Sequence, residues 1–235
     1  MADTKLDVRV YPIDEPKGKT KAFASVAVND LIAIRGVRVV EDKKGLFVAM
    51  PQTQGKDQKY YDIAFPLDKG LMREISKTVL GEYNRVAAIV PEQRGYDKSE
   101  KNDENITSIE NIKLEIRIFP LEEPQGGTKA FASISVDDLV AIRGVRVVEA
   151  GEGMFVSMPQ TQDKQMNYHD VAFPLTADLR REISARVLEQ FEMPEKSAER
   201  KQSLGDKLAA GTEKAAGHTA PAKSAAKSHK AGVLE

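Results

Sequence analysis

The sequence contains no cysteine and no tryptophan, and only three of its 235 residues are histidines. Without cysteine the chain can form no disulfide, has no thiol nucleophile and cannot build a zinc site of the cysteine type. The three histidines, His169, His218 and His229, lie too far apart to form a local metal-binding motif.

Long apolar runs are absent as well. No stretch approaches the roughly 18 consecutive apolar residues that span a bilayer, and residues 1–7 lack the apolar centre of a signal peptide. Hydrophobic residues make up 41% of the chain and charged residues 30%, a balance typical of folded soluble proteins. We therefore expect no membrane partner and a cytoplasmic location.

The chain also has no large excess of one charge, because it contains 35 Lys and Arg residues and 36 Asp and Glu residues. The resulting net charge gives no global reason to expect a polyanionic partner. Any such partner would have to bind a local basic patch.

What the chain does contain is an internal duplication. Residues 6–83 align with residues 114–191 at a constant offset of about 108 without a gap, and about 46 of the 78 positions are identical. Two copies are too few for a solenoid, which usually needs three or more stacked units. The pair instead suggests a fused dimer, so we expect the repeats to pair within the chain; further pairing into a homo-oligomer stays open.

The duplication divides the chain into four predicted segments. Repeat 1 spans residues 1–90 and is followed by a polar linker over residues 91–112. Repeat 2 spans residues 113–193, and an Ala/Lys-rich tail spans residues 194–235. The tail has no aromatic residue and too little apolar surface to order itself, which predicts disorder. The aligned parts of repeats 1 and 2 carry net charges of about +2 and −4, and the tail about +3, so the repeats should not contribute equally to binding a polyanion.

Each repeat reads as a series of strands. Alternating apolar and polar residues predict strands over 6–11 and 21–28, and a third over 32–41 whose alternation slips one place near Gly36. A bulge at Gly36 would keep Ile34 and Val37 on the core face and send Arg35 and Arg38 together to the opposite face.

A helix follows the strands. A fourth strand is predicted over 46–50 and a fifth over 60–65, with a polar loop over 52–59 between them. Asp68 is a candidate N-cap for a helix whose apolar residues, including Leu71, Ile75 and Val79, recur at helical spacing. This order predicts an α+β fold: two tandem domains, each a mostly antiparallel sheet of about five strands followed by a C-terminal helix.

One motif in each repeat is specific enough to suggest a family. Gly45-Leu46-Phe47-Val48-Ala49-Met50-Pro51 is followed some ten residues later by Asp62-Ile63-Ala64-Phe65-Pro66, and repeat 2 has the same pattern in residues 153–159 and 170–174. With these motifs each repeat resembles the SpoVG (stage V sporulation protein G, septation regulator) family over nearly its whole length.

The resemblance implies a regulator without catalytic activity. Members of the family are small bacterial proteins that form dimers, bind DNA and RNA, and regulate gene expression, cell division and sporulation. Two features depart from the family's pattern. The family usually has basic residues after Met-Pro, where this chain has the neutral runs 52–54 and 160–162, and it usually has one domain per chain.

Nucleic-acid affinity comes mainly from Lys and Arg at phosphates, so a binding site should contain basic residues on one predicted face. The candidates lie on the outer sheet face, in the polar loop and on the helices: Arg9, Arg35, Arg38, Lys56, Lys59, Arg73, Lys77, Arg143, Arg146, Arg180 and Arg181. For each of them the alternative is a solvated charge or an ion pair, for example with Glu41 or Asp62.

Other functions have weaker support in the sequence. Tyr60 and Tyr168 can be read as a base-stacking pair, although strand aromatics more often belong to the core. No Gly-rich phosphate loop, nucleophile elbow or metal-ligand cluster is present, and His169-Asp170 has Tyr61 at the histidine's place in repeat 1. We therefore expect neither an enzyme nor a cofactor.

Two function classes remain. The first is a DNA- or RNA-binding regulator of the SpoVG type. The alternative is a regulator of cell division that binds protein partners at sheet edges by strand addition, which the neutral net charge and the acidic second repeat favour.

Overall fold

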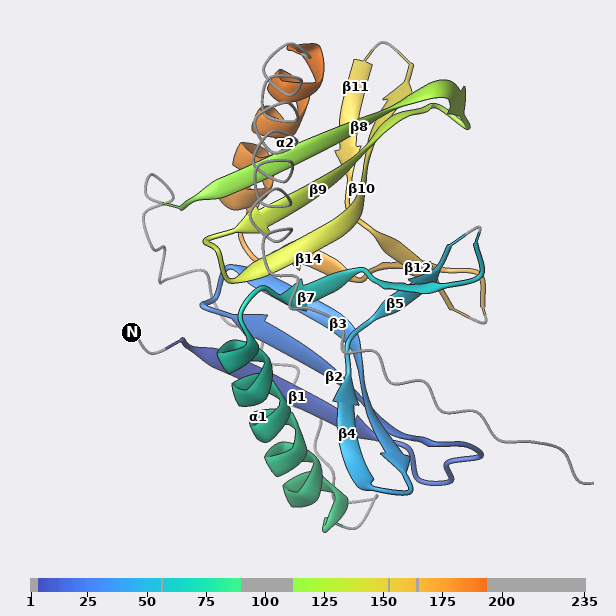
Figure 1. Cartoon of the computed structure of the whole chain (residues 1–235), viewed down its shortest axis with the longest axis vertical. Helices are drawn as coiled ribbons and strands as arrows, with labels where there is room; N and C mark the ends of the chain where they lie inside the picture. The colour runs from blue at the N-terminus through green and yellow to red at the C-terminus, as the bar shows by residue number, and fades with distance from the viewer. Residues whose placement is uncertain (1–3, 56, 90–111, 152, 164, 194–235) are drawn as a thin grey trace, which may run out of the picture. The chain divides into compact units, whose positions relative to one another are not determined.

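The structure, a computed structural model, describes residues 4–55, 57–89, 112–151, 153–163 and 165–193 (Figure 1). Repeat 1 contains β1 (Leu6–Pro12), β2 (Thr20–Val28), β3 (Ile32–Asp42), β4 (Gly45–Ala49), β5 (Gln52–Gln54), β6 (Tyr60–Asp62), β7 (Ala64–Pro66) and α1 (Lys69–Ala87). Repeat 2 contains β8 (Leu114–Gln125), β9 (Thr128–Val136), β10 (Val140–Ala150), β11 (Gly153–Ser157), β12 (Gln160–Gln162), β13 (Tyr168–Asp170), β14 (Ala172–Pro174) and α2 (Ala177–Glu192). The predictions for the tail and for linker residues 91–111 lie outside the described residues; Ile112 is described and is buried.

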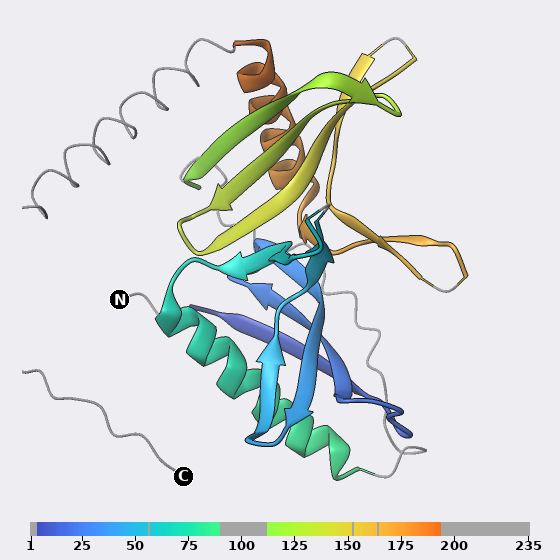
Figure 2. The ribbon, with the colours of Figure 1, turned by 45° about the vertical axis from the view of Figure 1, so that its right-hand side comes forward.

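The main sheet of each repeat is antiparallel. In repeat 1, β1 pairs with β2, β2 with β3, and β3 with β4, and β8 to β11 pair in the same order. The helix packs on one face of this sheet, where Leu71, Ile75 and Val79 are buried among the inward-facing strand residues (Figure 2). The predicted α+β fold of two tandem domains is confirmed.

The predicted helix start is also confirmed. The Asp68 side chain accepts a hydrogen bond from the backbone N of Leu71 at 2.9 Å, and Thr176 caps α2 in the same way through Leu179 N at 3.2 Å. Such a bond satisfies one of the backbone donors that the first turn of a helix leaves without a partner.

A bulge interrupts β3 at Arg35-Gly36. Val37 pairs with Ala24 and Ile34 with Val26, so two residues of β3 face the single residue Ser25 of β2. Gly36 has a φ of +74°, a left-handed conformation that side chains with a Cβ rarely adopt. The prediction is confirmed, because Ile34 and Val37 on either side of the bulge are both fully buried.

The two repeats exchange their last strands. β14 of repeat 2 pairs with residues 32–34 of β3, and β7 of repeat 1 pairs with residues 140–142 of β10 (Figure 1). Backbone hydrogen bonds extend the pairing, since Arg35 N donates to Val171 O and Arg143 N to Ile63 O, each at 2.7 Å. Each repeat thus completes the sheet of the other, and the chain is an intramolecular pseudo-dimer.

Two strand predictions are wrong. Residues 52–59 do not form only a loop, because β5 pairs with β6 in a two-stranded hairpin, and the predicted strand over 60–65 is divided into β6 and β7. The chain bends at Ile63, whose N donates to Pro51 O at 2.8 Å, and β7 then leaves for the other repeat. Every residue of β5 is polar and exposed, so the strand has no apolar alternation that a sequence could reveal.

Candidate nucleic-acid interface

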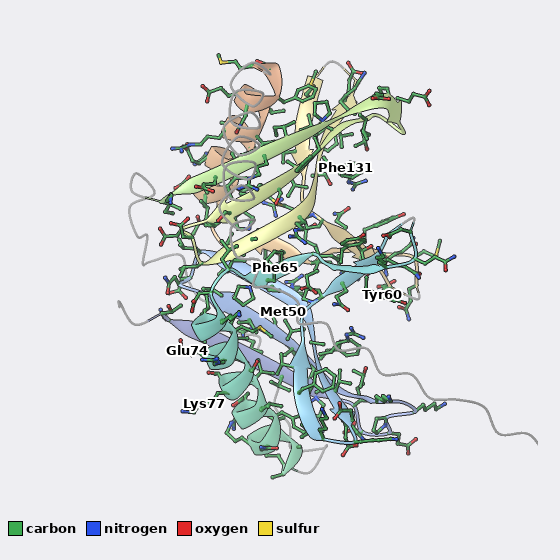
Figure 3. The ribbon with its side chains drawn as sticks, viewed as in Figure 1. Met50, Tyr60, Phe65, Glu74, Lys77 and Phe131 are labelled. Carbon is green, nitrogen blue, oxygen red and sulfur yellow. The ribbon has the colours of Figure 1, made fainter. Side chains whose placement is uncertain are left out.

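The sheet of each repeat has an outer face, on the side away from its helix. Along each strand, residues of this face alternate with the buried core residues, as the burial of β2 shows. In repeat 1 its basic and aromatic members are Arg9, Tyr11, Phe23, Arg35, Arg38 and Phe47. In repeat 2 they are Arg117, Phe119, Phe131, Arg143, Arg146 and Phe155, and Phe131 lies on the side away from α2 (Figure 3).

Strand register places the arginines of this face in neighbouring rows. Arg9 pairs with Ser25 of β2, and Ser25 is the residue opposite the bulge that carries Arg35. In the next row Phe23 of β2 pairs with Arg38 of β3. Because neighbouring strands lie about 4.8 Å apart, the three guanidinium groups project from one compact area.

Arg35 has a second role at the junction of the repeats. Its Cζ lies 4.6 Å from the ring centroid of Phe173, on the exchanged strand β14, and Arg143 lies over Phe65 of β7 at the same distance. A guanidinium over an aromatic face is attracted to the ring's electrons while its edges still reach solvent. Arg35 and Arg143 are exposed, so the stacked guanidinium groups remain part of the outer faces.

Arg38 and Arg146 occupy matching positions in the two repeats, one row of the sheet farther from the junction than Arg35 and Arg143. Arg146 Nη2 donates to Ser157 Oγ at 3.1 Å, whereas Arg38 lies opposite Ala49, which has no hydroxyl. Both side chains are half-buried. These partners lie in the same repeat as each arginine, so changing Arg38 and Arg146 leaves the Arg35–Phe173 and Arg143–Phe65 contacts in place.

The helix candidates lie on the opposite side of each repeat. Arg73 and Lys77 are on the exposed side of α1, and Lys77 points away from the sheet (Figure 3). On α2, Arg180 Nη2 lies 3.2 Å from Asp170 Oδ2, and Arg181 forms an ion pair with Asp178. The structure thus groups the sheet arginines on the outer faces, places Arg73 and Lys77 on the exposed side of α1, and pairs Arg180 with the hairpin residue Asp170.

The two-stranded hairpins hold the remaining candidates. Lys59 Nζ lies 3.7 Å from Asp57 Oδ2, and Lys56 is outside the described residues. Tyr60 and Tyr168, at the ends of β6 and β13, are 65% and 66% exposed and do not belong to the core.

In each hairpin the side chain at one matching position, Tyr61 or His169, pairs with an aspartate, although the two aspartates occupy different positions. His169 Nε2 lies 2.8 Å from Asp163 Oδ2, and in repeat 1 the Tyr61 hydroxyl donates to Asp57 Oδ2 at 2.7 Å. The bond to His169, supported by the Asn167 backbone N–H, lowers the pKa of Asp163 to about 2. His169 thus pairs with Asp163, while Asp170 pairs with Arg180.

Sequence reasoning missed the outer-face aromatic residues. Tyr11, Phe23 and Phe47, with Phe119, Phe131 and Phe155 in repeat 2, are between 39% and 48% exposed. A signal was present, because Phe23 stands between the core residues Ala22 and Ala24 and so faces the other way.

Among the residues that the structure describes, no three or more Asp, Glu or His side chains are grouped as metal ligands. None of the described helices is long and apolar enough to cross a membrane.

Comparison with known protein families gives a match for each repeat. The SpoVG family model matches residues 4–85 and again residues 112–193. The chain belongs to the SpoVG family. The resemblance inferred from the Met-Pro motifs is confirmed for both copies.

Individual SpoVG relatives are each about as long as one repeat. A protein named as septation protein SpoVG of Staphylococcus epidermidis is 33% identical over 98 residues, which cover 95% of that protein and 42% of this chain. The SpoVG of Myxococcus xanthus is 38% identical over 79 residues, or 78% of its length and 34% of this chain. A Listeria monocytogenes protein named SpoVG 2 is 32% identical over 102 residues, 95% of its length.

Proposed function

We propose that this SpoVG protein is a non-enzymatic regulator that binds DNA or RNA through the outer faces of its two sheets. The observation that supports the proposal is the grouping of three arginines on each outer face, at matching positions in the two repeats. Clustered arginines displace the counterions of phosphates, which is the main source of nucleic-acid affinity. The names of the relatives indicate septation as the regulated process.

The charge of each outer face supports equal roles for the repeats. Asp7 and Glu115 are the matching acidic residues of β1 and β8, and at the β3–β4 turn repeat 1 has Asp42 together with Lys43 and Lys44. The acidic excess of repeat 2 therefore does not come from its outer face. We therefore propose that the two faces bind alike, although the net charges of the repeats predict unequal contributions.

The experiment compares two charge reversals of equal size. Arg38→Glu with Arg146→Glu changes the outer faces, and Arg73→Glu with Lys77→Glu makes the same change in net charge on α1. Binding of labelled single-stranded RNA and duplex DNA is followed by fluorescence anisotropy at about 50 and 200 mM salt. We expect the outer-face variant to lose about tenfold or more in affinity and to have a shallower salt dependence, and the helix variant to lose much less.

Two results would contradict the proposal. Equal losses for both variants would mean that a general charge effect, and not the outer face, accounts for binding. No salt-sensitive binding by the wild type would favour the protein-interaction alternative, in which partners add a strand to β1 or β8, the terminal strands of the two sheets. Measuring the affinity of residues 1–193 beside that of the full chain shows how much of it comes from the lysines of the tail.

A further inference from the structure

Aromatic side chains and arginines are interleaved on each outer face. Tyr11 pairs with Phe23, Phe23 pairs with Arg38, and Phe47 lies on β4 two residues from Ala49, the partner of Arg38. Directly paired residues have Cβ atoms about 5 Å apart and diagonal ones about 7–8 Å. Arg38 therefore stands between the rings of Phe23 and Phe47.

These rings contribute little to the core of the domain. They are 39% to 48% exposed and face away from the helix, while the core of each sheet lies on its other side. Repeat 2 keeps an aromatic residue at all three positions, with Phe119 in place of Tyr11. Three half-exposed rings interleaved with arginines give a surface that offers both flat apolar faces and positive charge.

A nucleic-acid strand matches both parts of this surface. Its phosphates are attracted to the arginines, and its bases have flat faces that stack on aromatic rings. In a duplex the base faces are covered by their neighbours in the stack, so only an unpaired strand can offer them to Phe23 or Phe131. A second copy of this chain fits less well, because two outer faces in contact would bring six arginines together.

We infer that each outer face is a stacking site for single-stranded nucleic acid, with Tyr11, Phe23 and Phe47 in repeat 1 and Phe119, Phe131 and Phe155 in repeat 2 holding bases while the arginines hold phosphates. The inference rests on the proposed function and adds the kind of strand that is bound. It predicts a preference for single strands over duplexes, which arginines alone would not produce.

The test separates stacking from phosphate contact by removing the bases. The probes are a 20-nucleotide single-stranded DNA, the same strand with abasic sites throughout, its duplex, and the RNA version of the single strand. The variant is Phe23→Leu with Phe131→Leu in the full chain, because leucine retains apolar bulk but has no flat π face. The control is Tyr60→Leu with Tyr168→Leu, which removes exposed rings from the hairpins.

We expect the wild type to bind the base-bearing strand at least about tenfold more tightly than the abasic strand or the duplex. The Phe23/Phe131 variant should lose much of this preference, because it binds the base-bearing strand more weakly while its affinity for the abasic strand stays at the wild-type value. The hairpin control should keep the wild-type preference. Circular dichroism and urea unfolding show whether each variant is folded, and the RNA probe shows whether the sugar matters.

The outcomes distinguish this inference from the proposed function. If the wild type binds base-bearing and abasic strands equally, or prefers the duplex, the stacking site is wrong although the outer-face arginines can still bind phosphates. If the preference disappears only in the hairpin control, bases stack on Tyr60 and Tyr168 instead. If the wild type binds none of the probes, the proposed function fails and the inference fails with it.

Discussion

The guanidinium of Arg35 stacks on the ring of Phe173, although the two residues belong to different repeats. Arg143 makes the equivalent contact with Phe65, so two such contacts link the repeats, each beside an exchanged strand. The residues that present positive charge on the outer faces therefore also hold the repeats together.

The Arg35–Phe173 contact can be measured by a double-mutant cycle. We expect Phe173→Leu and Arg35→Ala to lower the free energy of unfolding, and the double variant to lose less than the sum, with a coupling energy of about 0.5–1 kcal/mol. Urea unfolding of the four proteins gives this value. Phe155→Leu, at an exposed ring on β11, is the control and should show no coupling to Arg35→Ala; strictly additive losses at Phe173 would contradict the contact.

Gly36 and Gly81 should respond to alanine with opposite signs. Gly36 has a positive φ, and its added Cβ would meet only Pro51 Cβ at 3.8 Å, so the cost comes from the backbone and is about 1–2 kcal/mol. Gly81 lies within α1 with open space around it, and alanine there should stabilise by up to about 1 kcal/mol. Thermal unfolding of Gly36→Ala and Gly81→Ala measures both changes in stability. A Gly36→Ala protein as stable as the wild type would argue against the bulge.

The exchanged strands predict that the repeats stay together after the chain is cut. A protease site inserted between residues 98 and 102 would separate the two repeats covalently without touching β7 or β14. Because each of these strands completes the other repeat's sheet, the halves should elute as one complex and separate only in denaturant. Two independent folded monomers after cleavage would contradict the exchange.

Asp163 should titrate far below an ordinary carboxyl group. Its pKa is lowered to about 2, so the bond to His169 is fully present above pH 3.8 and is lost as the pH falls toward 2. NMR titration of the side-chain carboxyl measures this directly. In His169→Phe the midpoint should rise toward 3.8 without reaching it, because the backbone N–H groups of Gln165 and Asn167 still donate to Asp163; an unchanged midpoint would contradict the role of His169.

Features of the fold with local causes could be predicted from the sequence. The slip in alternation at Gly36 predicted the bulge, and Asp68 before the Leu71–Ile75–Val79 stripe predicted the helix. The bulge in turn explains why Arg35 and Arg38 share a face. The position of Phe23 between two core alanines is the same kind of local signal for the aromatic residues of the candidate site. Its ring can be distinguished from a core ring, however, only once the position of the helix shows which face of the sheet is exposed.

The strand exchange has no local cause. β7 can pair with residues 32–34 of its own repeat or 140–142 of the other, and these read Ile-Ala-Ile and Val-Ala-Ile. Two partners so alike in sequence offer no basis for a choice, so the strand sequences alone do not predict the exchange. The separation of Arg73 and Lys77 from the sheet arginines is likewise a property of the packed domain.

Joining the two halves of a strand-exchanged pair in one chain also frees it from symmetry. In a dimer of identical chains every substitution occurs twice, so both faces must change together. Here Arg180 forms an ion pair with Asp170 while its counterpart is Met72, and Arg146 contacts a serine where Arg38 lies opposite an alanine. One gene can thus adapt one face to a new target while the other face keeps the original one.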